Sequence, residues 1–469
     1  MHRRKFIEAT SATALGALLV NPLSTFAAAA SKKKLALVGT GIRGMRFWGS
    51  TVKNNYGDLV EFVGLCDLNE GRMQYAKERM EVGCPTFTNY EQMLRSVKPD
   101  IVIVTTTDSE HDKQIIKALE MGCDVITEKP MTTDEIKCKA ILDAEKRTGK
   151  KVTVAFNYRH GPHPTKVKEL LSQNRIGKVT SVDFNWYLNV YHGADYFRRW
   201  HGLMNKSGSL WVHKSTHHFD LLNWWLDSDP VEVTAYGKLE HYGKNSPFRG
   251  KRCMGCEHKD KCKFYWDITK DETMMNLYVA NEKYDGYIRD NCVFREEIDI
   301  YDKMSAQIVY ANGVTVNYSL TTYSPYEGWR ISFNGMDGKM DTWLDIPYQP
   351  TSFENISQDE RHKIEMSSEK DEKPVGYAEI IVGDNFKKDV ESIKVPKYKG
   401  GHGGGDVRMH DRMFRNPQAP DPFKLMAGTR DGAMSLLIGV AARKSIEEKR
   451  PVTIAELTDI KPMETRPFS

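Results

Sequence analysis

The feature that most constrains this chain is a glycine-rich turn near its start. Residues 34–38 are an apolar run typical of a buried parallel strand, and Gly39, Gly41 and Gly44 follow before a helical pattern begins. Gly39 allows a tight turn, Gly41 lets the backbone approach a diphosphate, and Gly44 lets the helix pack closely on the strand. Since a helix N-terminus offers free N–H groups to phosphates, the pattern predicts a dinucleotide-binding strand–turn–helix unit.

A carboxylate stands where the ribose of such a nucleotide is expected. A second apolar run, residues 62–66, ends at Asp67, 23 residues beyond the third glycine. An acid there binds ribose hydroxyls and disfavours a 2′-phosphate, so NAD is expected and NADP less so. Ile42 and Arg43, inside the turn, are further expected cofactor contacts. Arg43 and Arg72 either neutralise phosphate or are simply solvated, and the sequence leaves both open.

Strand and helix patterns continue to alternate through the next ninety residues. This alternation predicts a doubly wound parallel sheet, with ligands at the carboxyl ends of its strands. Thr105, Thr106, Glu128 and Lys129 fall at such ends. The expected strands are 100–104, 124–126 and 151–155, and the expected helices are 112–121 and 132–148.

The hydrophobic period changes after residue 179, which indicates a second domain. Residues 181–191 alternate and are rich in aromatic residues, as in a strand. Residues 305–318 are two alternating runs joined by Asn312-Gly313, a strong hairpin signal, and 331–343 predict a second hairpin. Sugar rings stack on aromatic faces, so a carbohydrate pocket is one interpretation and a plain core the other. The aromatic residues concerned are Trp186, Tyr187, Tyr191, Tyr196, Trp200, Trp211, Trp224 and Trp225.

Taken together, the motifs resemble those of the Gfo/Idh/MocA oxidoreductases. The resemblance is carried by the glycine turn, Asp67 with Arg72, Glu128-Lys129-Pro130, Asn157-Tyr158-Arg159, and the segments 176–179 and 431–445. It implies an α/β fold with two domains. The first, 31–157, is a Rossmann doubly wound parallel sheet that binds NAD(P). The second, 158–469, is an α+β domain with a large, mostly antiparallel open sheet. One face of that sheet commonly joins subunits, so a homo-oligomer, dimer or tetramer, is expected.

The resemblance also implies site residues. Lys129 is expected to face the nicotinamide and the substrate, and the Lys129–Pro130 peptide is a candidate cis bond. Asn157 is expected at the cofactor, and Tyr158 and Arg159 at the substrate. A lysine beside the cofactor can hydrogen-bond a substrate hydroxyl or move its proton.

The family signature Asp-x-Gly-x-His-x-x-Asp is altered in this chain. Residues 213–220 read HKSTHHFD, so His217 and Asp220 are kept while His213 replaces the acid. We interpret His217 as an acid/base and Lys214 as a second one. His213 is a weaker substrate-binding candidate, and Asp220 fits a helix start or a partner for an imidazole. The carboxylate that often partners the catalytic histidine is missing from this segment.

A second glycine-rich loop, residues 400–406, contains His402 and Asp406. It lacks the strand-to-helix context of a phosphate loop. It resembles a glycine–histidine loop of exported family members, including the NAD-dependent glycosidases. His402 and Asp406 are therefore expected to reach the substrate, with a flexible loop as the alternative.

Four cysteines cluster in the second domain, between residues 253 and 292. Four thiolates from two nearby segments can complete a tetrahedral zinc site. The same residues can form two disulfides in an oxidising compartment, or stay as thiols. Residues 1–30 resemble a signal for export in the folded state, and folding in the cytosol favours metal loading over oxidation. A structural zinc is therefore the expectation, and disulfides or free thiols remain the alternatives. The residues are Cys253, Cys256, Cys262 and Cys292.

Residues 1–30 have the features of an export signal. Arg3 and Arg4 precede an apolar stretch and a run of four alanines, resembling a twin-arginine signal. This predicts a bacterial protein exported in folded form by the twin-arginine machinery, to the periplasm or beyond. With 67 Lys+Arg against 63 Asp+Glu, the chain is close to neutral, which argues against nucleic-acid binding. The polar, charged residues 351–375 are expected to be a surface insertion.

The sequence thus predicts an exported NAD(P)-dependent oxidoreductase that transfers hydride between a sugar hydroxyl and a tightly bound nicotinamide. A glycosidase using an oxidation–elimination–hydration–reduction cycle is the first alternative. A non-catalytic sugar-binding protein is the second.

Overall fold

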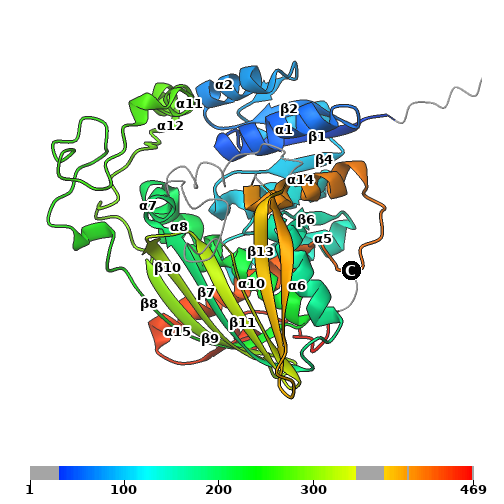
Figure 1. Ribbon diagram of the computed structural model, residues 1–469. Helices are drawn as coiled ribbons and strands as arrows, with labels where there is room; N and C mark the ends of the chain where they lie inside the picture. The colour runs from blue at the N-terminus through cyan, green and yellow to red at the C-terminus, as the bar shows by residue number, and fades with distance from the viewer. Residues whose placement is uncertain (1–30, 345–373, 399–400, 467–469) are drawn as a thin grey trace, which may run out of the picture.

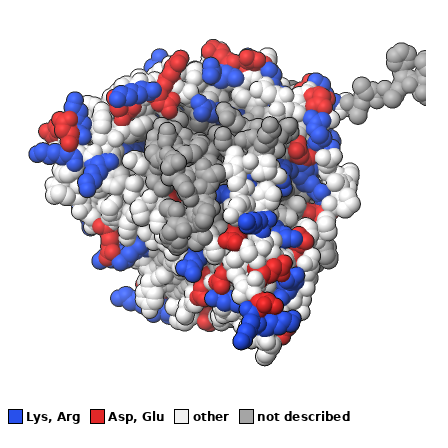
Figure 2. Space-filling model, viewed as in Figure 1, with Lys and Arg blue, Asp and Glu red and all other residues white. Residues whose placement is uncertain are grey.

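The computed structural model describes residues 31–344, 374–398 and 401–466. The expected signal, residues 1–30, and all but the last two residues of the expected insertion 351–375 lie outside this part of the chain. Two domains, each built on one sheet, lie one above the other in Figure 1. Lys/Arg and Asp/Glu side chains are interspersed over the face seen in Figure 2. Among the described residues, no helix has the length and apolar character that crossing a membrane requires.

The first domain contains a six-stranded, wholly parallel sheet in the order β3-β2-β1-β4-β5-β6. The strands are β1 (Lys33–Val38), β2 (Val60–Cys66), β3 (Thr86–Phe87), β4 (Ile101–Val104), β5 (Asp124–Thr127) and β6 (Val152–Val154). The order reverses between β1 and β4, and such a reversal opens a crevice at the carboxyl ends of the strands. The predicted doubly wound sheet is confirmed, and its crevice lies beside the glycine turn.

Helices α2 (Glu70–Met80) and α5 (Glu135–Thr148) of the first domain begin where a short polar side chain caps them. Asn69 accepts a hydrogen bond from the Arg72 N–H, and Asp134 accepts one from the Lys137 N–H. The predicted start of the fifth helix at residue 132 is therefore three residues too early. A π-helix, η1 (Arg43–Ser50), follows the glycine turn directly. The other α-helices are α1 (Thr51–Tyr56), α3 (Tyr90–Val97) and α4 (His111–Glu120).

The second domain contains a nine-stranded sheet in the order β14-β13-β12-β11-β7-β10-β9-β8-β15. All neighbouring pairs are antiparallel except β7 and β10. The predicted hairpin at Asn312-Gly313 joins β9 to β10, with Gly313 at φ +85°. The strands are β7 (Val179–Asn189), β8 (Pro230–Lys238), β9 (Lys303–Tyr310), β10 (Thr315–Ser324), β11 (Gly328–Gly335), β12 (Gly338–Leu344), β13 (Pro374–Asp384), β14 (Val390–Tyr398) and β15 (Val452–Thr453).

Helices cover one face of this sheet and leave strand residues of the other face exposed, as the alternating burial of β9 and β10 shows. Helix α15 is buried along most of its length against β8 and α10. Figure 1 shows α6, α10 and α15 on the covered side. The helices are α6 (Pro162–Ser172), α7 (Val190–Arg198), α8 (Met204–Ser207), α9 (Leu210–His213), α10 (Ser215–Leu226), α14 (Gly405–His410) and α15 (Thr429–Glu448).

A buried charge network ties distant parts of the second domain together. Arg159 is about 1% exposed and pairs with Asp220 at 2.5 Å and Asp431 at 2.9 Å. Arg466 in turn pairs with the same Asp431 at 2.9 Å and with the fully buried Asp229 at 2.8 Å. Because every one of these charges faces an opposite charge, the network can remain ionised inside the core.

Residues 239–302, which we call the return lobe, connect β8 to β9 and reach back to the first domain. The lobe carries α11 (Glu272–Leu277) and α12 (Glu282–Asp285), which lie beside α2 in Figure 1. The Ile42 N–H of the glycine turn donates to the hydroxyl of Tyr278 at 3.0 Å. Arg72 pairs with Asp285 at 2.6 Å. The lobe therefore bridges the nucleotide-side domain and the second domain.

Candidate active site

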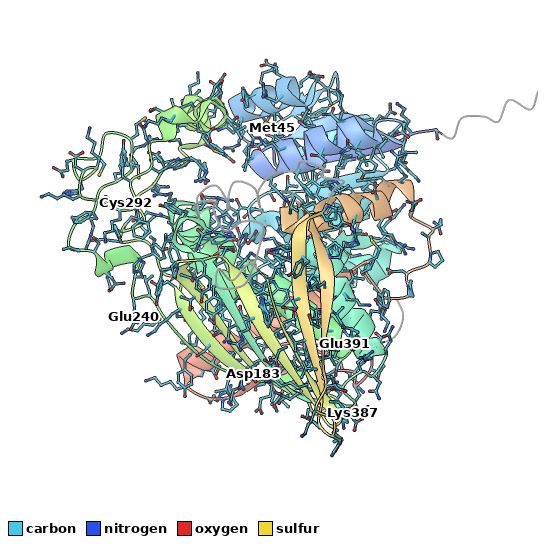
Figure 3. The ribbon with its side chains drawn as sticks, in the orientation of Figure 1. Met45, Asp183, Glu240, Cys292, Lys387 and Glu391 are labelled. Carbon is cyan, nitrogen blue, oxygen red and sulfur yellow. The ribbon has the colours of Figure 1, made fainter. Side chains whose placement is uncertain are left out.

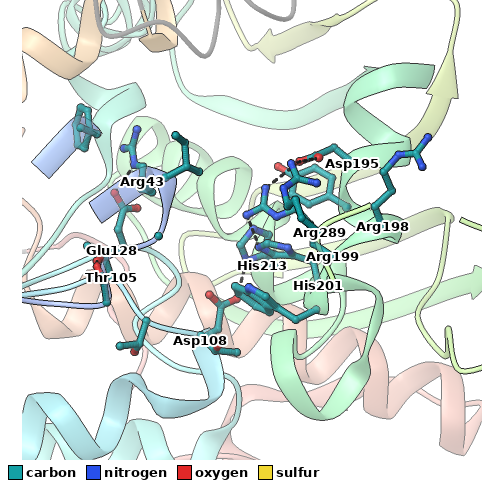
Figure 4. Close-up of a pocket in the computed structure, with 18 of the residues that line it drawn as sticks. Arg43, Thr105, Asp108, Glu128, Asp195, Arg198, Arg199, His201, His213 and Arg289 are labelled. Atoms are coloured by element: carbon teal, nitrogen blue, oxygen red, sulfur yellow. Dashed lines mark hydrogen bonds and ion pairs between the residues drawn. The ribbon is translucent and has the colours of Figure 1, made fainter. Parts of the chain in front are cut away.

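A cavity of about 2150 Å³ lies between the two domains, at the carboxyl ends of β1, β4 and β5. It exceeds the roughly 300–1,000 Å³ of a usual small-molecule pocket, so it can hold a dinucleotide and a substrate together. Figure 4 shows its two sides, with Arg43 and Glu128 on the nucleotide side and Arg199 and Arg289 opposite. The site is thus built from both domains.

The glycine turn has the geometry that a dinucleotide requires. Gly39 has φ +90°, and a Cβ there would lie 2.6 Å from backbone atoms of Thr105. A Cβ on Gly44 would lie 2.1 Å from the carbonyl oxygen of Gly39, so this glycine permits close helix packing, as predicted. Gly41 lines the cavity, and a Cβ on it would meet only the hydroxyl of Tyr278, at 3.4 Å. The turn therefore leaves its backbone open toward the cavity, which fits a diphosphate.

Asp67 lines the cavity at the end of β2. Its carboxylate accepts hydrogen bonds from the Thr40 N–H at 2.7 Å and the Thr40 hydroxyl at 3.0 Å. Arg72 pairs with the same carboxylate at 3.1 Å. Arg72 is thus held in ion pairs with two acids and is not simply solvated; because it lines the cavity, phosphate neutralisation stays a prediction.

Arg43 is likewise bound to acidic residues. Its guanidinium lies 2.6 Å from Glu128, 3.6 Å from Asp406 and 3.5 Å from the ring centre of Phe47. Trp48 donates a further hydrogen bond to Glu128 at 2.8 Å. Glu128 and Arg43 both line the cavity, so the structure places them at the expected cofactor side.

The remaining expected cofactor contacts divide into two groups. Thr105 and Thr106 line the cavity, and the Thr105 hydroxyl donates to the Gly39 carbonyl at 2.5 Å. Asn157 is buried and does not line the cavity; its amide nitrogen lies 2.8 Å from Nδ1 of His402 and donates to Asp406 at 2.5 Å. Asn157 therefore positions those two side chains, and its expected direct contact with the cofactor is not supported.

Lys129 stands where the two sides of the cavity meet. The Lys129–Pro130 peptide is cis, as the sequence suggested. The Lys129 ammonium donates to the backbone oxygen of His213 at 3.3 Å, which links β5 to α9 of the other domain. Burial lowers the pKa of Lys129 to about 8, against the opposing attraction of Asp108 and Glu128. A lysine with this pKa can gain or lose a proton near neutrality.

A carboxylate does partner the altered signature, but it comes from the first domain. Asp108, in a short 3₁₀ turn after β4, lies 2.6 Å from Nδ1 of His213. Both side chains are buried and both line the cavity. Burial lowers the pKa of His213 well below its usual value and raises that of Asp108 well above. Sequence reasoning missed Asp108, although its place just after a parallel strand was a usable signal.

His217, Lys214, Tyr158 and His402 gather on the same side of the cavity. The rings of His217 and Tyr158 are 4.9 Å apart, and those of Tyr158 and His402 are 4.7 Å apart. Within the part of the chain that the structure describes, Nδ1 of His217 has no hydrogen-bond partner. Burial and nearby Lys129 hold the pKa of His217 well below its usual value, so its imidazole is neutral. A neutral imidazole can accept a proton from a hydroxyl.

His402 has a carboxylate partner. Its Nδ1 lies 3.0 Å from Asp406, and both residues line the cavity. The two rings of His402 and His217 are 5.6 Å apart. The glycine–histidine loop therefore brings an imidazole–carboxylate pair to the cavity, and its contact with substrate stays a prediction.

Two predictions from the sequence are wrong. Arg159 was expected to bind substrate, but it is enclosed in the core by Asp220 and Asp431 and does not line the cavity. Asp220 was expected at a helix start or beside an imidazole, yet it lies inside α10 and pairs with Arg159. The motif placed Arg159 correctly in the chain, but the direction of its side chain depends on partners far away in sequence.

The aromatic residues divide between cavity and core. Trp186, Tyr191, Tyr196 and Trp200 line the cavity, whereas Trp211, Trp224 and Trp225 are buried in the core and Tyr187 contacts Tyr326. His218 stacks on Trp186 at 3.7 Å, which makes it a core histidine. Sequence reasoning also missed a group on the far side of the cavity, consisting of Asp195, Arg199, His201 and Arg289.

The clustered cysteines line one small cavity in the return lobe, together with His258. Figure 3 places Cys292 in this lobe, away from Asp183 on the sheet. All eight cysteines are free thiols. Across residues 31–344, 374–398 and 401–466, no group of three or more His, Cys, Asp or Glu side chains is arranged to hold a metal ion. The structure does not support the zinc expectation. The residues are Cys253, Cys256, Cys262 and Cys292.

Comparison with known families identifies both domains. Residues 33–156 match the oxidoreductase family NAD-binding Rossmann fold, and residues 168–454 match the C-terminal alpha/beta domain of the same family. The chain belongs to the Gfo/Idh/MocA oxidoreductase family. The predicted fold class and family are therefore confirmed.

Relatives agree with this assignment. The chain is 35% identical to "Putative oxidoreductase YteT" of Bacillus subtilis over 91% of this chain and 98% of the relative. It is 23% identical to inositol 2-dehydrogenase/D-chiro-inositol 3-dehydrogenase of Lactiplantibacillus plantarum, over 51% and 68%. The fold also resembles levoglucosan dehydrogenase in complex with NADH and levoglucosan, with a TM-score of 0.61, 15% identity, and 90% and 100% of the two chains covered.

Proposed function

We propose that this Gfo/Idh/MocA protein is an exported enzyme that transfers hydride between a hydroxyl-bearing carbon of a sugar or sugar derivative and a tightly bound nicotinamide. One observation carries the proposal. Lys129 from the first domain and His217 from the second line one cavity beside the glycine turn. Relatives named as inositol and levoglucosan dehydrogenases support a polyhydroxylated substrate.

The residues present fit NAD at the nucleotide side of the cavity. Those that would hold it are Gly39, Gly41, Ile42, Arg43, Asp67, Thr105, Thr106 and Glu128. When bound, its nicotinamide would take the hydrogen of the carbinol carbon with the electron pair, leaving a carbonyl, or return it in the reverse direction. We favour NAD over NADP because the Asp67 carboxylate would repel a 2′-phosphate.

The protein's own groups then manage the hydroxyl proton. In the oxidation direction Lys129, with its pKa lowered to about 8, accepts that proton as a neutral amine. The neutral imidazole of His217, which lines the cavity, holds the hydroxyl or relays the proton. Lys214 lies 5.2 Å from the ring centre of Trp186, and its positive charge stabilises a developing alkoxide. The His213 carbonyl fixes the position of the Lys129 ammonium.

Retention of the nucleotide fits the position of the return lobe. The Tyr278 hydroxyl accepts a hydrogen bond from the Ile42 N–H at the glycine turn, so the return lobe would cover a nucleotide bound there. The twin-arginine-like start of the chain supports export, and a compartment without a replenished nucleotide pool favours a cofactor that stays bound. Replacing Arg3 and Arg4 with Lys should leave the protein in the cytoplasmic fraction if this export route is used.

A second candidate is the NAD-dependent glycosidase, and His402 favours it. The His402–Asp406 pair adds a second acid/base group 5.6 Å from the ring of His217. Oxidation, elimination, hydration and reduction need more than one proton transfer, which two such groups can supply. A non-catalytic sugar-binding protein is the third reading, and Lys129 with its lowered pKa argues against it.

The deciding experiment uses the full-length protein purified with its nucleotide. The nucleotide is released and identified by mass, and the protein is then incubated with free sugars and with aryl glycosides. Nicotinamide reduction by free sugar without glycoside cleavage supports the dehydrogenase. Glycoside cleavage without net reduction supports the glycosidase, and neither reaction supports the binding protein.

A homo-oligomer is also proposed, because one face of the nine-stranded sheet carries exposed side chains on β9 and β10. Light scattering of the purified protein tests it, and a monomer at all concentrations would contradict it.

A further inference from the structure

Two arginines on the far side of the cavity share a single carboxylate. Arg289 pairs with Asp195 at 2.5 Å, and Arg199 pairs with the other oxygen of Asp195 at 2.8 Å. Asp195 and Arg199 come from α7 and the residue after it, whereas Arg289 comes from the return lobe. Figure 4 shows these side chains opposite Arg43 and Glu128, so the pair lies at the end of the cavity away from the glycine turn.

Arg289 is the member with unused donors. Its side chain is 7% exposed, and among the described residues its Nε and Nη1 atoms have no hydrogen-bond partner. A guanidinium remains charged under all ordinary conditions, so the free-energy cost of burying its charge cannot be relieved by loss of a proton. Unused donors on a buried cation therefore point to an anion that binds there.

One further carboxyl stands near this end, that of Asp108 beside His213, and burial raises its pKa well above the usual value. Nδ1 of His201 also lacks a partner among the described residues, and its ring lies 4.1 Å from that of His213. Burial and the nearby cations hold the pKa of both histidines well below the usual value, so both are neutral. The surplus positive charge of the arginine pair is thus left for a ligand.

We infer that Arg289 and Arg199 form a carboxylate-binding subsite, and that the substrate is a sugar acid such as a uronic acid. The inference rests on the proposed function, whose substrate class it narrows. Two guanidiniums against one carboxylate leave one positive charge, which matches a singly charged carboxylate better than a phosphate dianion. Nε and Nη1 lie on different edges of the Arg289 guanidinium, so each can donate a single charge-assisted hydrogen bond to an anion.

Trp266 lies against the Arg289 guanidinium. Its ring centre lies 5.0 Å from the Arg289 guanidinium carbon, and Trp266 lines the cavity too. A ring against the guanidinium makes no hydrogen bond with it, so the unpartnered Nε and Nη1 remain as donors for an anion. The substrate carboxylate would then lie at the arginine end, with the ring hydroxyls toward Lys129.

The test compares matched acidic and neutral sugars, D-glucuronate with D-glucose and D-galacturonate with D-galactose. For the wild-type protein we expect at least one uronate to have a kcat/KM about 10- to 100-fold above that of its neutral partner. This ratio corresponds to one charge-assisted hydrogen bond, which only the uronate can make. Arg289→Gln should remove this preference by raising KM for the uronate while leaving the neutral sugar unchanged. Arg289→Lys should restore it in part. Lys206→Gln removes an exposed lysine from the same cavity lining and should leave the preference intact.

Nucleotide content and thermal stability are measured on every variant. Arg289→Gln protein that retains its nucleotide but loses the uronate-induced rise in Tm supports the subsite. Loss of the nucleotide in that variant, or no preference for either uronate in the wild type, overturns it. Turnover of neutral sugars alone would overturn this inference and leave the proposed function standing. If no sugar, acidic or neutral, reduces the nicotinamide, the proposed function itself fails.

Discussion

The lowered pKa of Lys129 gives the sharpest prediction about the reaction. With a pKa of about 8, roughly one Lys129 side chain in ten is an uncharged amine at pH 7. A lysine with the unperturbed value of 10.5 would be uncharged in only about one molecule in three thousand. Burial between the two domains therefore raises the population of the active base about 300-fold.

The sign of the pH dependence follows from this role. Sugar oxidation needs the amine, so its rate should rise about tenfold per pH unit from pH 6 and level off above about pH 8. Sugar-product reduction needs the ammonium, so its rate should fall above the same pH. Lys129→Met should lower the oxidation rate by about 10²- to 10⁴-fold and abolish the rise with pH.

The assay follows reduction of the bound nicotinamide by its absorbance in single-turnover mixing, from about pH 6 to 10. Lys168 provides a matched control, since burial also lowers its pKa to about 8 while its ammonium donates to the Trp224 carbonyl, outside the cavity. Lys168→Met should keep the wild-type profile. A Lys129→Met protein that contains nucleotide and still shows the rise near pH 8 would refute the assignment.

Three further predictions concern binding and stability. Arg159→Met should lower the free energy of unfolding by about 3–5 kcal/mol, because it leaves Asp220 buried without its partner. Urea denaturation measures this, and a loss below about 1 kcal/mol would contradict the buried network. Tyr278→Phe should speed release of the bound nucleotide about tenfold, because it removes the hydroxyl that accepts from the Ile42 N–H. An unchanged release rate on dilution would contradict a role of the return lobe in retaining the nucleotide. Gly39→Ala should yield protein without nucleotide, since the φ of +90° at Gly39 and a backbone contact at 2.6 Å exclude a side chain. A normal nucleotide content, measured by mass, would show that the turn tolerates a side chain there.

Features encoded locally could be predicted from the sequence. The parallel strands are apolar runs, and the glycines sit where close backbone contacts require them, so the first domain followed from short-range pattern alone. The Asn312-Gly313 turn likewise determined the hairpin between β9 and β10. Lys129 and His217 could be found because each lies within a short motif, and both line the cavity.

Long-range pairing could not be predicted. His213 was a doubtful candidate because the acid beside it in space, Asp108, comes from the other domain and 105 residues earlier. Arg199 and Arg289 belong to separate segments, and only the path of the return lobe brings them to the same carboxylate. Arg159 shows the converse error, since a motif can place a residue in the chain without revealing that opposite charges turn it inward.

The buried charge network has a consequence for synthesis on the ribosome. Arg159 opens the second domain, but its partner Asp431 is translated 272 residues later, and Arg466 a further 35 residues on. The first sheet uses only residues 33–154, so it can fold while translation continues. The second domain cannot complete its folding as early, because a nascent chain that ends before α15 contains Arg159 but not yet Asp431, its second counter-ion. Completion of this domain therefore waits until Asp431 and Arg466 have both left the ribosome, and a chain terminated before them would expose an unfinished domain to proteolysis.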